Sequence, residues 1–169
     1  VLNGGWQAWL AAGYPTRAGR ERRQPYPFSG DPNPAWVATA AEVDALRQNP
    51  IARVVDARAP DRFAGQSETL DPLAGHIPGA RNRFWQANLA PDGKFLPPAE
   101  LKTALTQLLR ETEPQDTVFY CGSGVSAAHH VLAQAIAGLP LGRIYDGSWS
   151  DWITRPGLPI HNPSEDKNP

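Results

Sequence analysis

Between residues 39 and 152, short apolar runs alternate with segments of helical periodicity, and this alternation restricts the fold more than any other feature. The apolar runs over 52–55, 117–120 and 143–145 are typical of buried strands, and Asp56 ends the first of them. Strands that alternate with helices favour a parallel α/β sheet. Such a sheet binds its ligands at the carboxyl ends of its strands.

The segments between these runs carry signals for the ends of helices. Thr39, followed three residues later by Glu42, has the pattern of a capping box. The pair Pro97-Pro98 opens a second helix. The leucines expected on its apolar face are Leu101, Leu105, Leu108 and Leu109. A third helix is expected over 124–137, with Gly138 as its stop. Its expected apolar residues are Val125, Leu132 and Ile136.

The composition is that of a globular protein, with 41% hydrophobic and 20% charged residues in a chain of 169. Sixteen basic and seventeen acidic residues leave a net charge of −1, so neither a nucleic-acid partner nor a membrane surface is expected. No apolar run reaches the roughly 18 residues of a transmembrane helix. The single cysteine, Cys121, excludes an internal disulfide framework and a Cys-rich zinc site. We expect a soluble, cytoplasmic protein without a metal.

Two segments repeat one pattern of glycine, tryptophan and proline. The first copy has Gly4, Trp6, Trp9, Gly13 and Pro15. The matching residues of the second copy, in the same order, are Gly147, Trp149, Trp152, Gly157 and Pro159. Tryptophans three residues apart share one helix face, so we interpret each copy as a glycine turn and a short helix that closes a domain. The alternative is an N-terminal helix that is rich in tryptophan by chance.

The repeat predicts how the chain is organised. Almost nothing precedes the first copy, so we expect residues 1–16 to be the tail of a first domain and residues 36–160 to be a complete second domain. Four arginines and then four prolines, which cannot continue a helix or a ladder, fill an expected linker over 17–35. Residues 161–169 are expected to form a polar tail.

Cys121 lies where the strand over 117–120 meets the next helix. The loop that follows is Gly122-Ser123-Gly124-Val125-Ser126-Ala127. Its two glycines and two hydroxyl residues allow a tight turn with the backbone N–H groups directed inward. Such a nest at a helix N-terminus binds anions and stabilises a thiolate. We therefore interpret Cys121 as a nucleophile, rather than as a small buried side chain.

The loop also indicates which electrophile the thiolate attacks. A cysteine-based phosphatase needs an arginine six residues after the cysteine to clamp the phosphate. Position 127 is Ala127, and no basic residue occurs from Gly122 to Ala127. A phosphoryl dianion would lack its main counter-charge, so phosphatase chemistry is disfavoured and sulfur is the favoured electrophile.

The loop over 121–127 is similar to the active-site loop of 3-mercaptopyruvate sulfurtransferases in the rhodanese superfamily, with Ser126 where the family usually has Thr. Segments 54–58, 62–63 and 75–82 resemble the first rhodanese signature, and segment 145–152 resembles the second. The resemblance covers about 36–160, and 1–16 resembles the end of the family's inactive first domain. It implies a parallel five-stranded sheet with helices on both faces.

The resemblance also implies a reaction. The Cys121 thiolate takes sulfur from 3-mercaptopyruvate as a persulfide, releases pyruvate, and passes the sulfur to cyanide, a thiol or a thioredoxin-like protein. No other cofactor is implied. The loop N–H groups would hold the persulfide, Ser123 would orient or protonate the leaving enolate, and Arg62 with Arg58 would bind the donor carboxylate. A missing N-terminal rhodanese domain, possible as a separate chain, would contribute a His and an Asp that assist Ser123.

Other interpretations stay open. Asp56 and Arg58 can simply pair with each other, Arg62 can be a surface charge, and His76 is expected to fix a turn rather than act as a base. Thiosulfate-preferring rhodaneses carry a basic pair where Gly122 and Ser123 stand here. A thiosulfate sulfurtransferase and a non-catalytic rhodanese-like binding module are therefore the alternative functions. Family members often have further arginines within the segment 63–75, which contains none here.

Overall fold

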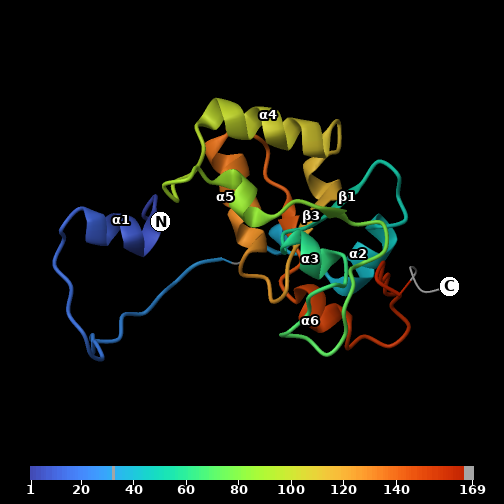
Figure 1. Ribbon diagram of the computed structural model, residues 1–169, viewed down its shortest axis with the longest axis horizontal. Coiled ribbons are helices and arrows are strands. Elements are labelled where there is room, and N and C mark those ends of the chain that lie inside the picture. Colours follow the sequence, from blue (N-terminus) through green and yellow to red (C-terminus); the bar gives the residue numbers. More distant parts are fainter. Residues whose placement is uncertain (32, 166–169) are drawn as a thin grey trace.

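The computed structural model describes residues 1–31 and 33–165 (Figure 1). Of the expected polar tail, residues 166–169 lie outside the described residues. The α-helices are α1 (Gly5–Ala11), α2 (Ala40–Leu46), α3 (Pro60–Phe63), α4 (Pro98–Leu109), α5 (Ala127–Ile136) and α6 (Ser148–Trp152). The strands are β1 (Arg53–Asp56), β2 (Arg81–Asn82), β3 (Thr117–Tyr120) and β4 (Arg143–Ile144). Short 3₁₀ turns cover Pro34–Trp36, Trp85–Asn88 and Pro114–Asp116.

The strands form one parallel sheet in the order β2-β1-β3-β4. Its centre is the β1–β3 pair, where Val55 lies beside Phe119 and Asp56 lies beside Tyr120. The parallel α/β class is confirmed, but the expectation of five strands is wrong: the described residues form four. Val37 makes only an isolated bridge to Ile144 beyond β4. Only Val37 and Ala38 separate a 3₁₀ turn from the N-cap of α2, and they form this bridge without extending it into a strand.

Alternate residues of the central strands point to opposite faces of the sheet, as the period of two requires. Val54 and Val118 pack with residues of α2 and α6 on one face, whereas Val55 and Phe119 pack with residues of α4 and α5 on the other. In Figure 1, α4 lies at the top of the molecule and α6 at the bottom. The expected cover of helices on both faces is therefore present.

Two of the helix predictions are confirmed in detail. Thr39 and Glu42 form both hydrogen bonds of the capping box at the start of α2. Pro98 is the first residue of α4, as expected for a residue without a backbone N–H. The leucines of α4 that are buried are Leu101, Leu105 and Leu109, with Leu108 half-buried beside them.

The prediction for the third helix is wrong at its start and in its buried face. The helix α5 begins at Ala127, three residues later than expected, and Val125 lies in the preceding loop with 78% of its surface exposed. Leu132 and Ile136 are only half-buried. The buried residues of α5 are Ala127, His130, Ala133 and Gln134. Small alanines on this face let the helix lie close to β3, and His130 and Gln134 fill the other buried positions.

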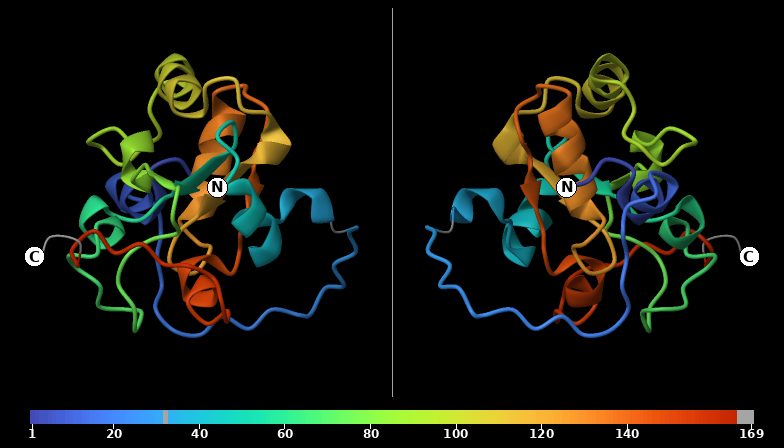
Figure 2. Two further views of the ribbon diagram at one scale, coloured as in Figure 1. Left: turned by 90° about the vertical axis from the view of Figure 1, so that its right-hand side faces the viewer. Right: turned by 90° about the vertical axis from the view of Figure 1, so that its left-hand side faces the viewer.

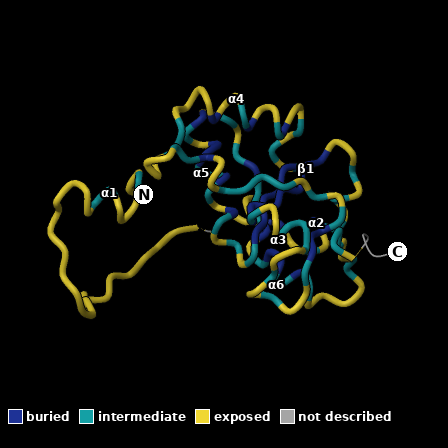
Figure 3. The backbone as a smooth tube through the Cα atoms, viewed as in Figure 1, coloured by how far each residue is buried: buried dark blue, intermediate teal, exposed yellow. Residues whose placement is uncertain are grey.

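The helix α1 and the segment after it lie beside the sheet domain rather than within it (Figures 1 and 2). No residue of α1 is buried, and residues 10–31 are exposed throughout, as the yellow tube in Figure 3 illustrates. Among residues 1–31 and 33–165, one side-chain hydrogen bond joins the segment before α1 to the domain: the Phe95 N–H donates to Asn3 Oδ1 at 2.9 Å. Among the described residues, no helix has the length and apolarity that crossing a membrane would require.

The two copies of the repeat share two local features, although Gly4 is left-handed with φ +92° and the matching Gly147 is not, with φ −61°. In each copy, the second tryptophan donates its indole N–H to the carbonyl of the matching proline: Trp9 to Pro15 at 3.2 Å and Trp152 to Pro159 at 2.9 Å. The residue before the first tryptophan is left-handed in both, with φ +58° at Gly5 and +55° at Ser148. The surroundings differ, because Trp152 is fully buried whereas Trp9 is only half-buried.

Candidate active site

Cys121 directly follows β3 at the carboxyl edge of the sheet, and 3% of its surface is exposed. The loop of residues 122–126 then leads into α5. Gly124 has φ +83°, which favours glycine, and its ideal Cβ position lies 2.4 Å from the carbonyl oxygen of Asp146. The loop therefore turns in a conformation that no other residue type could adopt without displacing the backbone around Asp146.

The start of α6 holds this loop by its carbonyl groups. The N–H of Trp149 donates to the Cys121 carbonyl at 3.0 Å, and the N–H of Ser150 donates to the Gly122 carbonyl at 2.9 Å. Ser150 Oγ lies 2.8 Å from the same Gly122 oxygen. The N–H of Cys121 donates to Ser148 Oγ at 3.0 Å. Two loop carbonyls thus point towards α6.

The remaining backbone donors of the loop are available. Within the described part of the chain, none of the N–H groups of residues 122–126 donates a hydrogen bond. Residues 122, 124 and 126 are half-buried, and a run of N–H groups without a protein partner beside a buried thiol can bind an anion. This arrangement can stabilise a thiolate or a persulfide on Cys121 by charge-assisted hydrogen bonds.

The side chain of Ser123 lies at the exposed side of the loop, and its hydroxyl makes no hydrogen bond within residues 1–31 and 33–165. Ser126 is the N-cap residue of α5, yet its side chain does not cap the helix. Both hydroxyls are therefore free to contact a substrate. The expected role of Ser123 towards a leaving enolate is compatible with this position and stays a prediction.

Asp56 and Arg58, at the carboxyl end of β1, form a buried ion pair. Arg58 Nη2 lies 2.7 Å from Asp56 Oδ2, and the two side chains are 1% and 0% exposed. Arg58 Nη2 also donates to the Gly75 carbonyl at 2.7 Å, and the guanidinium carbon lies 4.8 Å from the centre of the Trp149 ring. Burial opposes the charge on Arg58, but Asp56 outweighs it and raises the pKa of Arg58. These contacts favour the alternative in which Arg58 pairs with Asp56 and does not bind substrate.

Arg62 is the cation that lies beside the cysteine loop. Its Nη1 is 3.5 Å from the ideal Cβ position of Gly122, the residue after Cys121. Its side chain, 19% exposed, is bound by Glu68, with Nη2 at 2.8 Å from both carboxylate oxygens and Nε at 3.1 Å from Oε2. Asp71 Oδ2 lies 3.4 Å from Nη2. The structure therefore places Arg62 where a donor carboxylate could reach it, but already paired with acidic side chains.

Glu68 is held rigidly on this guanidinium. Its side chain is 3% exposed, and Oε1 accepts hydrogen bonds from the backbone N–H groups of Leu70 and Asp71 at 3.0 and 3.2 Å. Burial alone would raise the pKa of Glu68, but the Leu70 N–H and Arg62 outweigh burial and lower it. Glu68 is therefore ionised at neutral pH.

His76 lies under α3 rather than in the cysteine loop. Its Nδ1 is 2.7 Å from the Phe63 carbonyl, and its ring stacks on the Phe63 ring at 3.7 Å. Burial is the main cause that lowers the pKa of His76. These contacts agree with the expectation that His76 fixes a turn rather than acts as a base. His130 is likewise buried and bonded to the Asn88 amide and the Arg83 carbonyl, as a structural histidine would be.

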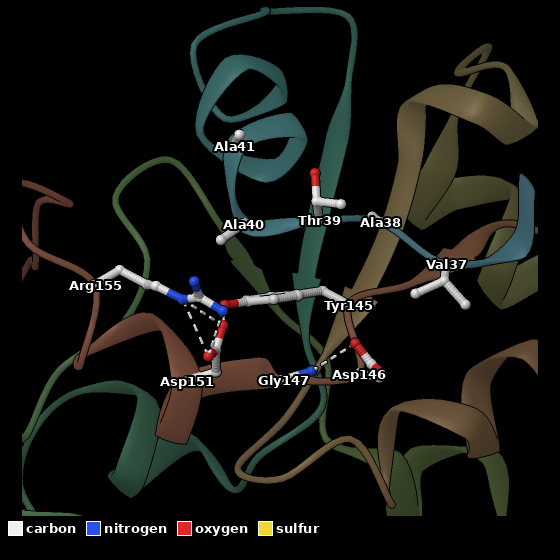
Figure 4. A pocket seen from close by; sticks show the side chains of 10 residues that line it. All are labelled: Val37, Ala38, Thr39, Ala40, Ala41, Tyr145, Asp146, Gly147, Asp151 and Arg155. Carbon is white, nitrogen blue, oxygen red and sulfur yellow. Dashed lines mark hydrogen bonds and ion pairs between the residues drawn. The ribbon is translucent and has the colours of Figure 1, made fainter. Parts of the chain in front are cut away.

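The cavity drawn in Figure 4, of about 610 Å³, does not belong to this site. Its lining runs from the residues before α2 to Tyr145, Asp151 and Arg155, and includes neither Cys121 nor Arg62. Cys121 lies instead beneath a loop whose outer residues, Ser123 and Val125, are exposed. No group of three or more His, Cys, Asp or Glu side chains among the described residues could hold a metal ion.

Sequence reasoning did not find four residues that surround the cysteine loop: Glu68, Asp71, Ser148 and Ser150. Both serines lie within the 145–152 motif, so a signal was present, but only the fold brings them to Cys121 and Gly122. The two acidic residues fill the segment in which arginines were expected from the family.

The comparisons with known proteins agree with this geometry. A rhodanese-like domain matches residues 39–155. Over 160 residues the chain is 44% identical to a probable 3-mercaptopyruvate sulfurtransferase of Pseudomonas aeruginosa, and the alignment covers 95% of this chain and 56% of that protein. It is 35% identical to the 3-mercaptopyruvate sulfurtransferase of Rattus norvegicus, over 92% of this chain and 52% of that protein. It is 34% identical to the thiosulfate sulfurtransferase of the same organism, over 92% of this chain and 53% of that protein.

Among solved structures, the anaerobic ergothioneine biosynthesis enzyme from Chlorobium limicola has the same fold. It superposes with a TM-score of 0.80 at 23% identity, over 95% of this chain and 40% of that one. The chain spans about half the length of the curated relatives that it matches. The domain match over 39–155 and the 44% identity show that the chain belongs to the rhodanese family.

Proposed function

We propose that this chain transfers sulfur from 3-mercaptopyruvate, through a persulfide on Cys121, to a thiol or cyanide acceptor. The free N–H groups of residues 122–126 around the buried Cys121 carry the proposal. They form a site for the negative charge of a thiolate and then of a persulfide. The relatives named as 3-mercaptopyruvate and thiosulfate sulfurtransferases support the same reaction class.

In the first half-reaction, the Cys121 thiolate attacks the thiol sulfur of 3-mercaptopyruvate. An S–S bond forms and the C–S bond breaks, and its electron pair leaves with carbon as the enolate of pyruvate. The enolate takes up a proton, and we propose that the exposed hydroxyl of Ser123 delivers it and is reprotonated by water. In the second half-reaction the acceptor attacks the outer sulfur and Cys121 leaves as a thiolate. Sulfur is carried on Cys121 itself, so we propose a cycle without a metal or an organic cofactor.

The absence of charge on the loop supports 3-mercaptopyruvate over thiosulfate as the donor. Residues 122–127 include no basic side chain. A basic side chain at position 122 would have its Cβ 3.5 Å from Arg62 Nη1 and would bring a second positive charge close to Arg62, which like charges disfavour. Arg62 remains as the cation near the loop, which suits a donor with one carboxylate better than a compact dianion.

We further propose that residues 1–16 belong with a preceding rhodanese-like domain. The indole–carbonyl bond of Trp9 and Pro15 repeats that of Trp152 and Pro159 in the closing helix of the described domain. Trp6 is 60% exposed, whereas its counterpart Trp149 is fully buried. A domain that buries Trp6 would complete the likeness, and from the family resemblance it would add a His and an Asp near Ser123.

A free cysteine suits a reducing compartment, so we propose the cytoplasm as the location.

The test is the intact mass of the protein after incubation with 3-mercaptopyruvate, with Cys121→Ser as control. Because the chain has one cysteine, a gain of one sulfur on the wild type alone assigns the persulfide to Cys121. No gain on a folded protein, alone and after addition of a preceding rhodanese-like domain, would contradict the proposal. That result would favour a binding module.

A further inference from the structure

We infer that Asp71 selects sulfur donors by charge, disfavouring dianions relative to monoanions at Cys121. This inference rests on the proposed function and adds to it the class of donor that the site rejects. Asp71 lies in the segment between α3 and β2, and its side chain is 10% exposed. It lies beside the cysteine loop although it is fifty residues from Cys121 in sequence.

Two contacts fix Asp71 at the loop. Its Oδ1 accepts a hydrogen bond from Ser150 Oγ at 2.7 Å, and Ser150 Oγ lies 2.8 Å from the carbonyl of Gly122. Its Oδ2 lies 3.4 Å from Arg62 Nη2. The carboxylate therefore sits between the cation that would bind a donor and the backbone of the residue that follows Cys121.

The charges around the loop do not cancel. Two of the carboxylates have a close guanidinium partner: Asp56 binds Arg58 at 2.7 Å, and Glu68 binds Arg62 at 2.8 Å. Asp71 is the third carboxylate, and its only cation within 4.0 Å among the described residues is Arg62 at 3.4 Å, which Glu68 already binds more closely. Three carboxylates against two guanidiniums leave an excess of one negative charge in this cluster.

Arg62 consequently offers an incoming anion little more than Nη1. Its Nε and Nη2 are bound by Glu68 and Asp71, whereas Nη1, on the side of Gly122, has no partner within the described residues. A carboxylate donor can take this single nitrogen. A dianion such as thiosulfate needs more counter-charge, and its repulsion from Asp71 is twice that of a monoanion, because Coulomb energy is proportional to charge.

The single cysteine permits a test that does not require sulfur transfer. The rate constants for alkylation of Cys121 by iodoacetate, a monoanion, and by neutral iodoacetamide are measured on Asp71→Asn and on the wild type. Asparagine keeps the acceptor for Ser150 and removes only the charge. We expect the iodoacetate-to-iodoacetamide ratio to rise about ten-fold, which is the effect of removing a unit charge roughly 12 Å away at an effective dielectric constant near 20.

The matched control is Asp92→Asn, which removes the same charge from an exposed pair with Lys94 and should leave the ratio unchanged. Asp71→Glu, which keeps the charge, should retain the wild-type ratio, and Asp71→Ser provides a second neutral variant if the asparagine does not fold. Equal ratios in the wild type and a folded neutral variant would overturn the inference, as would an equal rise in Asp92→Asn.

The same variants are then compared as sulfur acceptors by intact mass. We expect the rate of sulfur gain from thiosulfate, relative to 3-mercaptopyruvate, to rise about ten-fold in Asp71→Asn on the same Coulomb argument. A shifted alkylation ratio without sulfur gain from either donor, both alone and after addition of a preceding rhodanese-like domain, would support the effect of Asp71 and contradict the proposed function. Sulfur gain from both donors with unshifted ratios would support the function and contradict the role of Asp71.

Discussion

Ser148 Oγ accepts the backbone N–H of Cys121 at 3.0 Å and donates to the carbonyl of Tyr145 at 2.8 Å. One fully buried hydroxyl thus joins the end of β4 to the first residue of the cysteine loop. Ser148 does this from a left-handed backbone conformation with φ +55°, which costs free energy for any residue other than glycine. At position 148 the backbone conformation therefore favours glycine, whereas the two hydrogen bonds require a side-chain hydroxyl.

These two demands can be separated by substitution. Ser148→Ala leaves the buried Cys121 N–H without an acceptor, which lowers the free energy of unfolding by about 1–3 kcal/mol. Ser148→Gly removes the same hydroxyl but relieves the backbone, so we expect it to be more stable than the alanine variant by about 1 kcal/mol. Urea unfolding measures both, with Ser29→Ala in the exposed segment as control. A glycine variant less stable than the alanine variant would contradict this account.

Gly124→Ala should damage the loop far more than Gly93→Ala. Both glycines have positive φ, +83° and +76°, so alanine costs about 1–2 kcal/mol at either position. Only at Gly124 would the new Cβ meet another group, the Asp146 carbonyl at 2.4 Å, while Gly93 has nothing within 4 Å. We expect Gly124→Ala to lose additional stability and most of the Cys121 sulfur gain in the intact-mass experiment. Equal stability of the two variants would show that the close approach to Asp146 does not constrain the loop.

Asp56→Asn should destabilise the protein by about 3 kcal/mol, because the buried Arg58 guanidinium loses its closer carboxylate and keeps only Glu68 Oε2 at 3.4 Å. The comparison is Asp44→Asn, which breaks a more exposed pair with Arg47 and should cost no more than about 1 kcal/mol. Adding Arg58→Met to the Asp56 variant should recover part of the loss. Equal unfolding midpoints for the two asparagine variants would contradict the structural role of the Asp56–Arg58 pair.

The stability of the protein should fall between pH 7 and pH 5, with His130 as one cause. His130 Nε2 donates to the Arg83 carbonyl, so Nδ1 is unprotonated and accepts from the Asn88 amide. A proton on Nδ1 would break this second hydrogen bond. Burial lowers the pKa of His130 from 6.5 to about 4. Between these values the unfolded chain binds more protons than the folded one. Stability therefore falls as pH decreases and levels off below about pH 4.

For His130 this loss is about 2 kcal/mol between pH 7 and pH 5, and His130→Gln should show a correspondingly smaller loss in urea unfolding. Burial also lowers the pKa of His76 and of His129, so part of the slope will remain in the variant. Glu42 acts in a different range: hydrogen bonds lower its pKa to about 2, so its contribution is lost only below about pH 4.5. An identical pH slope in wild type and variant would contradict the assignment to His130.

What the sequence predicted well depends on short stretches of chain. The α2 capping box, the proline at the start of α4 and the position of Cys121 after β3 all follow from residues within a few positions of one another. Local hydrogen bonding and steric limits decide such features, so the sequence states them directly.

What the sequence did not predict depends on segments that are distant along the chain. α5 begins at Ala127 because the preceding loop is held by contacts with Asp146 and α6, not by its own helix propensity. The pairing of Arg62 with Glu68 and Asp71 likewise follows from how one loop packs, and no periodic pattern marks it. The fifth strand was expected from the family resemblance, but the short stretch around Val37 forms one bridge only.

The two copies of the repeat also place their tryptophans in two different optical environments, because one copy is buried and the other is not. Trp149 and Trp152 have no exposed surface, so their fluorescence should be blue-shifted and protected from a dissolved quencher, whereas Trp6 is 60% exposed and should emit like indole in water. A protein surface that covers α1 would move the emission of Trp6 towards that of Trp149. The difference spectrum of Trp6→Phe would therefore report whether α1 is packed against a neighbour, without any added label.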